Sequence, residues 1–471
     1  MAVVTRVAED RRISRRIGAQ WPAWRKRLWP ESGAVSPNPA LDGLRAVAAL
    51  LVLLFHAWTI LPSYIQAEQS PTAYPLWYAK TGVHLFFVLS GFLLFLPYAQ
   101  WLMGIRERPD MLLFYKRRAL RVIPAYWASL LIIGVLLHPA APGDLLIHFG
   151  FLSNTNWDSV FSINGVYWTM AIEVQFYVTL PLIALGMFTL ARRIGLLQAV
   201  VATLFVLFAL SVASTYLTQI GNFNLLTTPV VSSFLVQYAA MPHWLGVFAC
   251  GIACSLIYTY ATKVYPTRMA AGSSIGALWT QRSGNRALLL GVFLLILLST
   301  APFLRDVWMQ QVLFGLGYAG ILLGVLFGSP VLRWPLANPV MRFVGLISYS
   351  FYIWHHAALV VLGPKLHGAL AGQYHTIVLF VIGLAITIPI AYVSYQLFER
   401  PFIAVRRRSH ELVDQPVERM TRPADRNVIG ASDQGTLQFP LRQSLVSLVS
   451  GIASWRQLVT QCVRRVGERD R

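Results

Sequence analysis

The sequence predicts an all-α polytopic membrane protein with about ten transmembrane helices and both termini in the cytoplasm. Two observations predict this fold class. The 471 residues are 56% hydrophobic and only 12% charged, and apolar runs long enough to cross a bilayer recur along the chain. The Lys and Arg residues gather on one side of the predicted membrane, as they do in the cytoplasmic segments of membrane proteins.

Apolar segments define the predicted spans and their orientation. With the N-terminus inside, every Lys and Arg except Lys80, Arg305 and Lys365 falls on the cytoplasmic side, and a shift of one helix would spoil this partition. We therefore expect a multi-pass protein of the plasma membrane, in contact with membrane lipids. The predicted spans are 43–61, 82–99, 122–138, 167–190, 194–217, 234–260, 287–304, 309–328, 343–362 and 375–398.

The net charge of +20 reflects this topology, so we expect no nucleic-acid partner. The three cysteines, Cys250, Cys254 and Cys462, give no disulfide framework. The sequence has no zinc motif, P-loop, dinucleotide fingerprint or Gly-x-Ser-x-Gly elbow. We therefore expect no metal site and no redox cofactor.

The predicted membrane domain covers 41–402 and lies between two basic tails. Residues 1–40 interleave Lys and Arg with tryptophans, a pattern that predicts a tail on the cytoplasmic membrane surface. No cleavable signal peptide is visible, so we expect the first span to remain as an anchor. Residues 403–471 are basic and largely disordered by composition, and only 441–461 has the pattern of an amphipathic surface helix.

Two polar residues interrupt the first span, Arg45 and His56. They stand eleven residues apart and therefore share one helical face, with His56 about 16 Å further into the membrane. An ionisable group at that depth is costly unless the protein pairs it, and such groups mark functional sites in membrane proteins. We interpret His56 as functional. The alternative is a hydrogen bond to a neighbouring helix and nothing more.

Glu173 is the carboxylate that lies well inside a predicted span, about 9 Å below the outer face, while His56 lies about 14 Å below it. At similar depths the two could pair, the carboxylate orienting the ring. His355 lies at a similar depth again. His84 begins the second span at the outer face, where we expect its side chain to reach the surface.

Two arginines on the cytoplasmic side, Arg118 and Arg121, lie three residues apart on one helical face, and Arg45 lies at the same membrane level. Clustered guanidinium groups suit the phosphates of a nucleotide-like ligand. The alternative is a topology signal that also binds anionic lipid, and charge alone favours this alternative.

The longest outer loop, 139–166, carries Asn154, Asn156, Asp158 and Asn164. Its polar composition suits the binding of a polar acceptor, and an ordinary solvated loop explains it equally well.

Six motifs, in their order along the chain, resemble acyltransferase family 3, the polytopic membrane O-acyltransferases. The resemblance covers about 40–402. The motifs are Leu41-Asp-Gly-Leu-Arg45 followed by His56, Leu85-Phe-Phe-Val-Leu-Ser-Gly-Phe-Leu93, Arg118-x-x-Arg121, Trp168 to Tyr177, Ile347 to His355, and Phe398-Glu-Arg-Pro-Phe402.

The resemblance implies about ten spans, an acyl-CoA donor bound from the cytoplasm as a co-substrate, and a hydroxyl acceptor that is often a sugar. It implies a catalytic role for His56 and a functional role for Glu173, which we assign to catalysis. It implies donor-side roles for Arg45, Arg118 and Arg121. We assign three further residues of the matched motifs to the substrate or donor site: His355, Tyr349 and Trp168.

Three departures from the family pattern affect these assignments. His84 stands where many members carry an acid. Val174 replaces a second Glu, so Glu173 is the only acid at that motif. The hydrolase-like domain that some members carry after the last span is not visible, so we expect transfer to finish within the membrane domain or on a separate protein.

We therefore predict transfer of a short acyl group, such as acetyl, from acyl-CoA to a hydroxyl of a cell-envelope glycan, a glycolipid or a glycosylated metabolite. The alternative is a proton-coupled transporter, since a His and a Glu at one depth also make a proton relay. The predicted spans show no matching halves of the kind that transporters contain.

Overall fold

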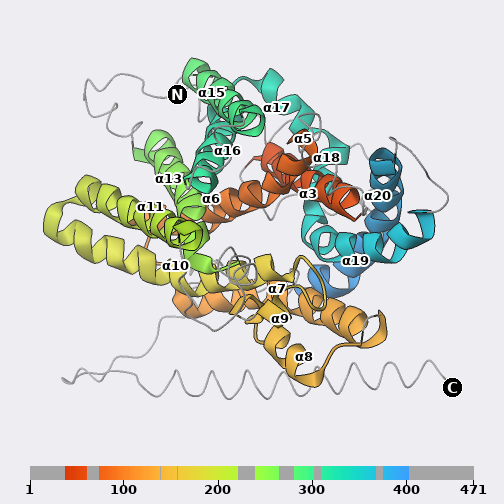
Figure 1. Cartoon of the computed structure of the whole chain (residues 1–471). Helices are drawn as coiled ribbons and strands as arrows, with labels where there is room; N and C mark the ends of the chain where they lie inside the picture. Colours follow the sequence, from red (N-terminus) through yellow and green to blue (C-terminus); the bar gives the residue numbers. More distant parts are fainter. Residues whose placement is uncertain are drawn as a thin grey trace, which may run out of the picture. The chain divides into compact units, whose positions relative to one another are not determined.

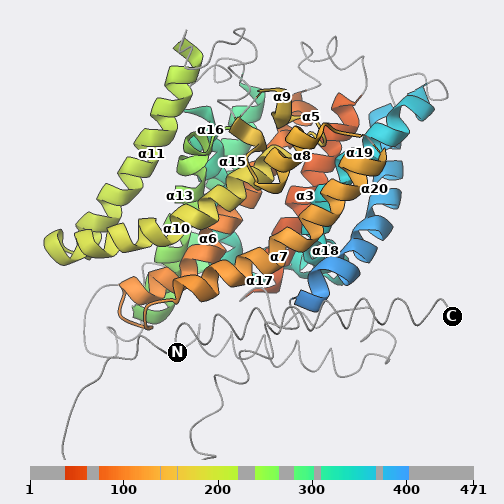
Figure 2. The same ribbon diagram turned by 90° about the horizontal axis from the view of Figure 1, so that it is seen from below.

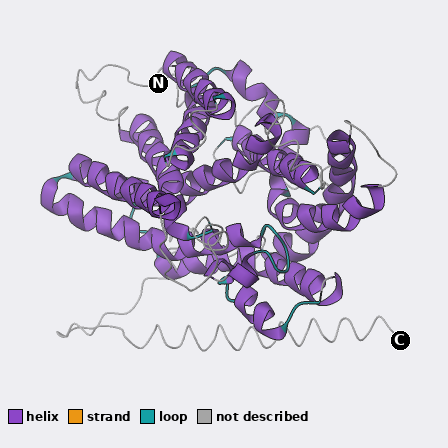
Figure 3. Ribbon diagram, viewed as in Figure 1, coloured by secondary structure: helices purple, strands orange, loops and turns teal. Residues whose placement is uncertain are grey.

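The computed structural model describes residues 38–60, 74–137, 139–155, 157–220, 239–264, 281–301, 309–367 and 375–402, all within one compact unit, 1–410. Every regular element in these ranges is a helix (Figure 3). Apart from residues 38–40, the two predicted tails, with the segment 441–461, lie outside the described residues.

The helices of the described ranges agree closely with the predicted spans. Nine of them are long and apolar enough to cross a membrane, and a tenth span results if α18 (Pro339–Leu346) and α19 (Ser348–His367), which meet at 75°, are taken together. The nine are α3 (Pro39–Thr59), α6 (Gly82–Leu102), α7 (Met111–Leu131), α10 (Tyr167–Ile194), α11 (Leu196–Ile220), α13 (Met241–Thr259), α15 (Gln281–Thr300), α16 (Gln310–Phe327) and α20 (His375–Ser394).

Short elements lie at the two ends of these helices (Figure 2). We call the end that carries α17 and the start of α3 the basic end, and the end that carries α8 and α9 the loop end. The short elements are α5 (Tyr74–Tyr78), η3 (Ala79–Thr81), α8 (Pro142–Phe149), η5 (Ser153–Thr155), α9 (Trp157–Val160) and α17 (Pro330–Ala337). Three of the long helices, α7, α13 and α20, continue into π-helical turns: η4 (Ile132–Leu137), η6 (Tyr260–Val264) and η8 (Tyr395–Glu399).

The first turn of α3 is fixed by a cap and by close packing. The side chain of Asn38 accepts a hydrogen bond from the backbone of that turn at 3.0 Å. A side chain at Gly43 would overlap the backbone of Leu336, and one at Gly345 would overlap the backbone of Asp42. Because glycine allows this approach, α17 and α18 pack directly on the start of α3.

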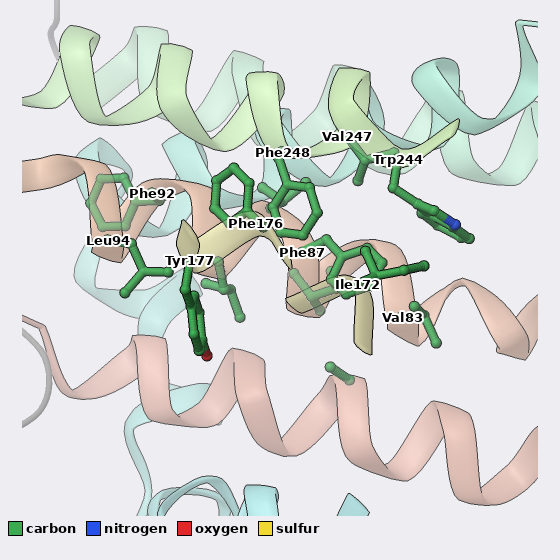
Figure 4. Close-up of a cluster of buried hydrophobic side chains, with 14 of the residues drawn as sticks. Val83, Phe87, Phe92, Leu94, Ile172, Phe176, Tyr177, Trp244, Val247 and Phe248 are labelled. Atoms are coloured by element: carbon green, nitrogen blue, oxygen red, sulfur yellow. The ribbon is translucent and has the colours of Figure 1, made fainter. Parts of the chain in front are cut away.

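Aromatic stacking joins α6, α10 and α13 in the core (Figure 4). Phe176 of α10 stacks on Phe248 of α13 with ring centroids 3.7 Å apart, and Phe87 of α6 stacks on the same ring at 4.6 Å. These contacts fix the rotation of α10, and with it the direction of Glu173, one turn before Phe176.

Candidate active site

A cavity lies among α3, α6, α7, α10 and α19, which are labelled in Figure 1, and its empty volume, open solvent included, is about 730 Å³. Its walls carry charged groups that would be costly to bury without partners or a ligand. The lining residues are Arg45, Val83, Phe86, Phe87, Ser90, Leu93, Leu94, Arg118, Arg121, Val122, Thr169, Met170, Glu173, Tyr177, Ser348, Tyr349 and Tyr352.

The three arginines that the sequence placed at one membrane level, Arg45, Arg118 and Arg121, all line this cavity. Arg45 interacts electrostatically with Arg121 and is balanced by two carboxylates, Asp42 and Glu173. Three arginines that line one cavity suit a polyanion, since each guanidinium group can bind a phosphate through two N–H groups.

Glu173 also lines the cavity, and it is the one carboxylate among the described lining residues. Ser90 of α6 donates a hydrogen bond of 2.9 Å to its Oε1, and the Tyr177 hydroxyl is a second hydrogen-bond partner. The carboxylate is therefore held towards the arginines and α6.

The expected hydrogen bond between Glu173 and His56 is not present. Nδ1 of His56 lies 3.0 Å from the carbonyl oxygen of Val52 and 3.0 Å from Nε2 of His355, while Glu173 is bonded to Ser90. The prediction of this pair is wrong because similar depth does not fix the direction in which a side chain leaves its helix.

His355 is completely buried, and its Nδ1 lies 2.7 Å from the carbonyl oxygen of Tyr352, one turn earlier in α19. A third ring, that of His356, meets the ring of His56 edge to face, with centroids 4.9 Å apart. A side chain at Gly165 would come within 2.9 Å of the His356 ring. The loop before α10 therefore lies directly against His356.

Tyr352 contacts both the cavity and the histidines. Its ring lines the cavity, and its hydroxyl accepts a hydrogen bond of 2.8 Å from Thr169. Its backbone oxygen faces His355, and its ring meets that of Phe86 edge to face at 5.7 Å. One residue thus links the arginine-lined cavity to the pair of His355 and His56.

Of the remaining predicted site residues, Tyr349 lines the cavity and Trp168 does not. The hydroxyl of Tyr349 donates to the carbonyl oxygen of Val122 at 2.8 Å, which ties α19 to α7 beside Arg121. Trp168 is half-buried and packs against Trp244, with ring centroids 5.7 Å apart.

His84 does not reach the surface as predicted. It is buried to 1% exposure and hydrogen-bonded to the side chain of Gln311 on α16, with the rings of Trp244 and Phe314 against it. The prediction is wrong because α16 supplies a polar partner that the position of His84 in its own span does not reveal.

Two asparagines of the predicted outer loop, Asn154 and Asn164, make structural hydrogen bonds, while Asn156 lies outside the described residues. Asn154 is bonded to Gln175 and to the carbonyl oxygen of Ala239, and Asn164 donates to the carbonyl oxygen of Ile353 at 3.0 Å. Both are buried, which favours the structural interpretation over a direct acceptor contact for these two residues.

Two buried carboxylates near the cavity were not singled out from the sequence, Asp42 and Glu399. Glu399 is completely buried, accepts a hydrogen bond of 2.6 Å from Ser350, and interacts electrostatically with Arg121 and Arg45. Both residues fall inside matched motifs, Leu41 to Arg45 and Phe398 to Phe402. Their position in these motifs is the sequence feature that could have identified them. Among the described residues, no group of three or more His, Cys, Asp or Glu side chains could hold a metal ion.

A family model described as an acyltransferase domain matches residues 38–396, which include every residue of the cavity wall and all three histidines. The chain belongs to acyltransferase family 3. The resemblance seen in its motifs is thus confirmed, and the described helices are those of a multi-pass membrane member of that family.

Relatives of this family member are named as acetyltransferases. It is 27% identical over 325 residues to the putative acetyltransferase ORF330 of Acidianus two-tailed virus, a match that covers 68% of this chain and 82% of the relative. It is 24% identical over 396 residues to the peptidoglycan O-acetyltransferase OatA of Listeria monocytogenes, covering 77% of this chain and 55% of the relative. For a putative O-acetyltransferase of Staphylococcus aureus the identity is 25% over 395 residues, covering 77% and 57%.

The chain thus spans little more than half the length of these two bacterial relatives. No solved structure matches it.

Proposed function

We propose that this protein transfers an acetyl or other short acyl group from acyl-CoA to a hydroxyl of a cell-envelope glycan, a glycolipid or a glycosylated metabolite, in the plasma membrane. One observation carries the proposal. A cavity lined by three arginines is also lined by Tyr352, whose backbone oxygen bonds His355, and His355 in turn contacts His56.

The arginines suit the donor. Coenzyme A carries phosphates at one end and the thioester at the other, and Arg45, Arg118 and Arg121 offer charge-assisted hydrogen bonds to those phosphates. The apolar part of the cavity wall, with Phe86, Phe87 and the leucines of α6, then accommodates the chain that leads to the thioester. No further cofactor is required.

His56 is the residue we assign to the reaction itself. Its ring nitrogen takes the proton of the acceptor hydroxyl while the oxygen attacks the thioester carbonyl. The new C–O bond forms, the C–S bond breaks, and the leaving thiolate takes the proton from the ring to give coenzyme A. If His56 instead carries the acyl group, the same nitrogen attacks the thioester first. Either route requires a lone pair on that nitrogen.

The acceptor would enter from the loop end, where Gly165 brings the loop over His356 and His56. The distribution of Lys and Arg supports a basic end in the cytoplasm, where acyl-CoA is made, and a loop end outside. The name of the Listeria relative, a peptidoglycan O-acetyltransferase, supports a glycan acceptor in the cell envelope.

The test is transfer by the purified protein in lipid, with radiolabelled acetyl-CoA and fragments of envelope glycan. His56→Ala should abolish labelled product while acyl-CoA still binds. General-base catalysis supplies about 10²- to 10⁴-fold, so turnover within tenfold of the wild type would contradict the role of His56. A proton flux across vesicles that does not need acyl-CoA would instead support the transporter. Labelled protein that is chased into product by acceptor would select the acyl-carrier route.

A further inference from the structure

We propose that His355 is a positioning residue that fixes the tautomer of His56: the proton lies on Nδ1 of His56, and the lone pair of Nε2 is the reacting atom. This inference rests on the proposed function of His56. It assigns to a second histidine the orienting role that the sequence suggested for Glu173.

The first step concerns the Nδ1 atom of His355. It lies 2.7 Å from the carbonyl oxygen of Tyr352, and a carbonyl oxygen can only accept a hydrogen bond. The carbonyl of Phe351 is a further backbone partner of the same ring. Nδ1 of His355 must therefore carry a proton.

The second step concerns the charge of His355. The ring is completely buried, and its described ring neighbours are the rings of Phe351, Tyr352 and His56. A positive charge is costly in such surroundings, so the ring is neutral. A neutral imidazole carries one proton, which is on Nδ1, and Nε2 of His355 is consequently an acceptor.

The third step transfers this assignment to His56. Its Nδ1 atom faces two acceptors at 3.0 Å, Nε2 of His355 and the carbonyl oxygen of Val52. Only an N–H group satisfies both, so Nδ1 carries the proton and is shared between them. In the neutral ring, Nε2 of His56 is then left with its lone pair.

This arrangement helps the reaction at two points. Before transfer, it holds the ring in one tautomer and one orientation, which a general base or a nucleophile requires. After Nε2 has taken the hydroxyl proton, the Nδ1–H group still donates to His355 and Val52, and the bonds strengthen because the donor ring is now charged. His355 remains neutral throughout, and it therefore acts without touching substrate.

The direct test is nitrogen NMR of the full-length protein in lipid, with ¹⁵N-labelled histidine and assignment from His56→Gln and His355→Gln. The expected spectrum has the proton on Nδ1 in both His56 and His355 at neutral pH. A proton on Nε2 of His56 in the wild-type spectrum would overturn the inference.

A kinetic test complements it. His355→Leu removes the acceptor and should lower kcat by about 10- to 100-fold, part of the roughly 10²- to 10⁴-fold of base catalysis, with the KM for acyl-CoA within about twofold. His355→Gln can place its amide oxygen near the former Nε2, so we expect it to recover part of that loss. The comparison variant is His356→Gln, which removes a ring that meets His56 without a hydrogen bond and should reduce kcat less than His355→Leu.

The outcomes separate this inference from the proposed function. Wild-type turnover in His56→Ala would contradict the proposed function. An inactive His56→Ala together with an unchanged kcat in a folded His355→Leu would contradict only the positioning role of His355. If His355→Leu does not fold, the NMR spectrum and His355→Gln decide.

Discussion

The hydroxyl of Ser90 donates a hydrogen bond of 2.9 Å to Oε1 of Glu173, and this bond holds the carboxylate inside the arginine-lined cavity, away from the ring of His56. The ionisable groups of the site thus form two separate pairs. Glu173 belongs with Arg45, and His56 belongs with His355.

Glu173→Gln is expected to lower kcat without raising the KM for acyl-CoA. The amide still accepts from Ser90, so the local structure is kept, but the negative charge is lost and with it the one described carboxylate of the cavity wall. A carboxylate repels phosphates, so its removal does not weaken donor binding. Steady-state kinetics with acetyl-CoA test this, with the exposed Glu107→Gln as the control. A raised KM at constant kcat would reassign Glu173 to donor binding.

Arg118→Gln and Arg121→Gln should each weaken acyl-CoA binding by about 1.5–3 kcal/mol, the range for hydrogen bonds to charged groups. Lysine at either position should recover part of this, since it keeps the charge but cannot form two parallel bonds. Lys116→Gln is a matched control, because this exposed residue lies on the same helix and does not line the cavity. If Arg118→Gln, Arg121→Gln and Lys116→Gln bind acyl-CoA with equal affinity in calorimetry at low salt, the arginines are a topology signal only.

Ser350→Ala should destabilise the protein by about 1–3 kcal/mol, because it removes the 2.6 Å hydrogen bond to Glu399, whose other oxygen is buried without a hydrogen bond. Thermal unfolding in detergent measures the effect. Thr189→Ala, at an exposed position, removes a local hydroxyl contact and should change stability by less than about 0.5 kcal/mol. An unfolding temperature of Ser350→Ala that matches Thr189→Ala would contradict the importance of the buried carboxylate.

Cysteines placed at Glu107 and Asp158 should lie on opposite sides of the membrane. Both positions are exposed, one before α7 and the other in the loop before α10. In a background without Cys250, Cys254 and Cys462, an impermeant thiol reagent should label Asp158→Cys in intact cells, and Glu107→Cys only after lysis. Labelling with the opposite preference would reverse the orientation that the basic residues predict.

The sequence predicted the helices well because each span is a long apolar run, and such a run can be recognised without knowledge of its neighbours in the fold. It also brought Arg45 and His56 to one face, since helical periodicity fixes angles within a single helix. The break between α18 and α19 was not predicted. Both helices are apolar, so the sequence on either side of the break looks like one continuous span, 343–362.

Relations between helices were harder to predict. Depth placed Glu173 near His56, but the aromatic stacking of Phe176 on Phe248 sets the rotation of α10 and turns the carboxylate towards Ser90. Glu399 stands beside Arg400 at a span end, where a charge pair resembles an ordinary membrane interface. Only the packing of η8 against α7 and α19 shows that this carboxylate is buried.

The packing of α3 against the last helices has a consequence for how the protein is made. The backbone of Asp42 packs against Gly345, and the ring of His56 contacts that of His355, both of them about three hundred residues later in the chain. As synthesis proceeds from the N-terminus, α3 therefore enters the bilayer with polar groups that lack these partners until the ninth predicted span has been made. A chain that stops before Pro339 leaves His56 without the ring of His355, so the first helix depends on the last spans for the partner of its buried histidine.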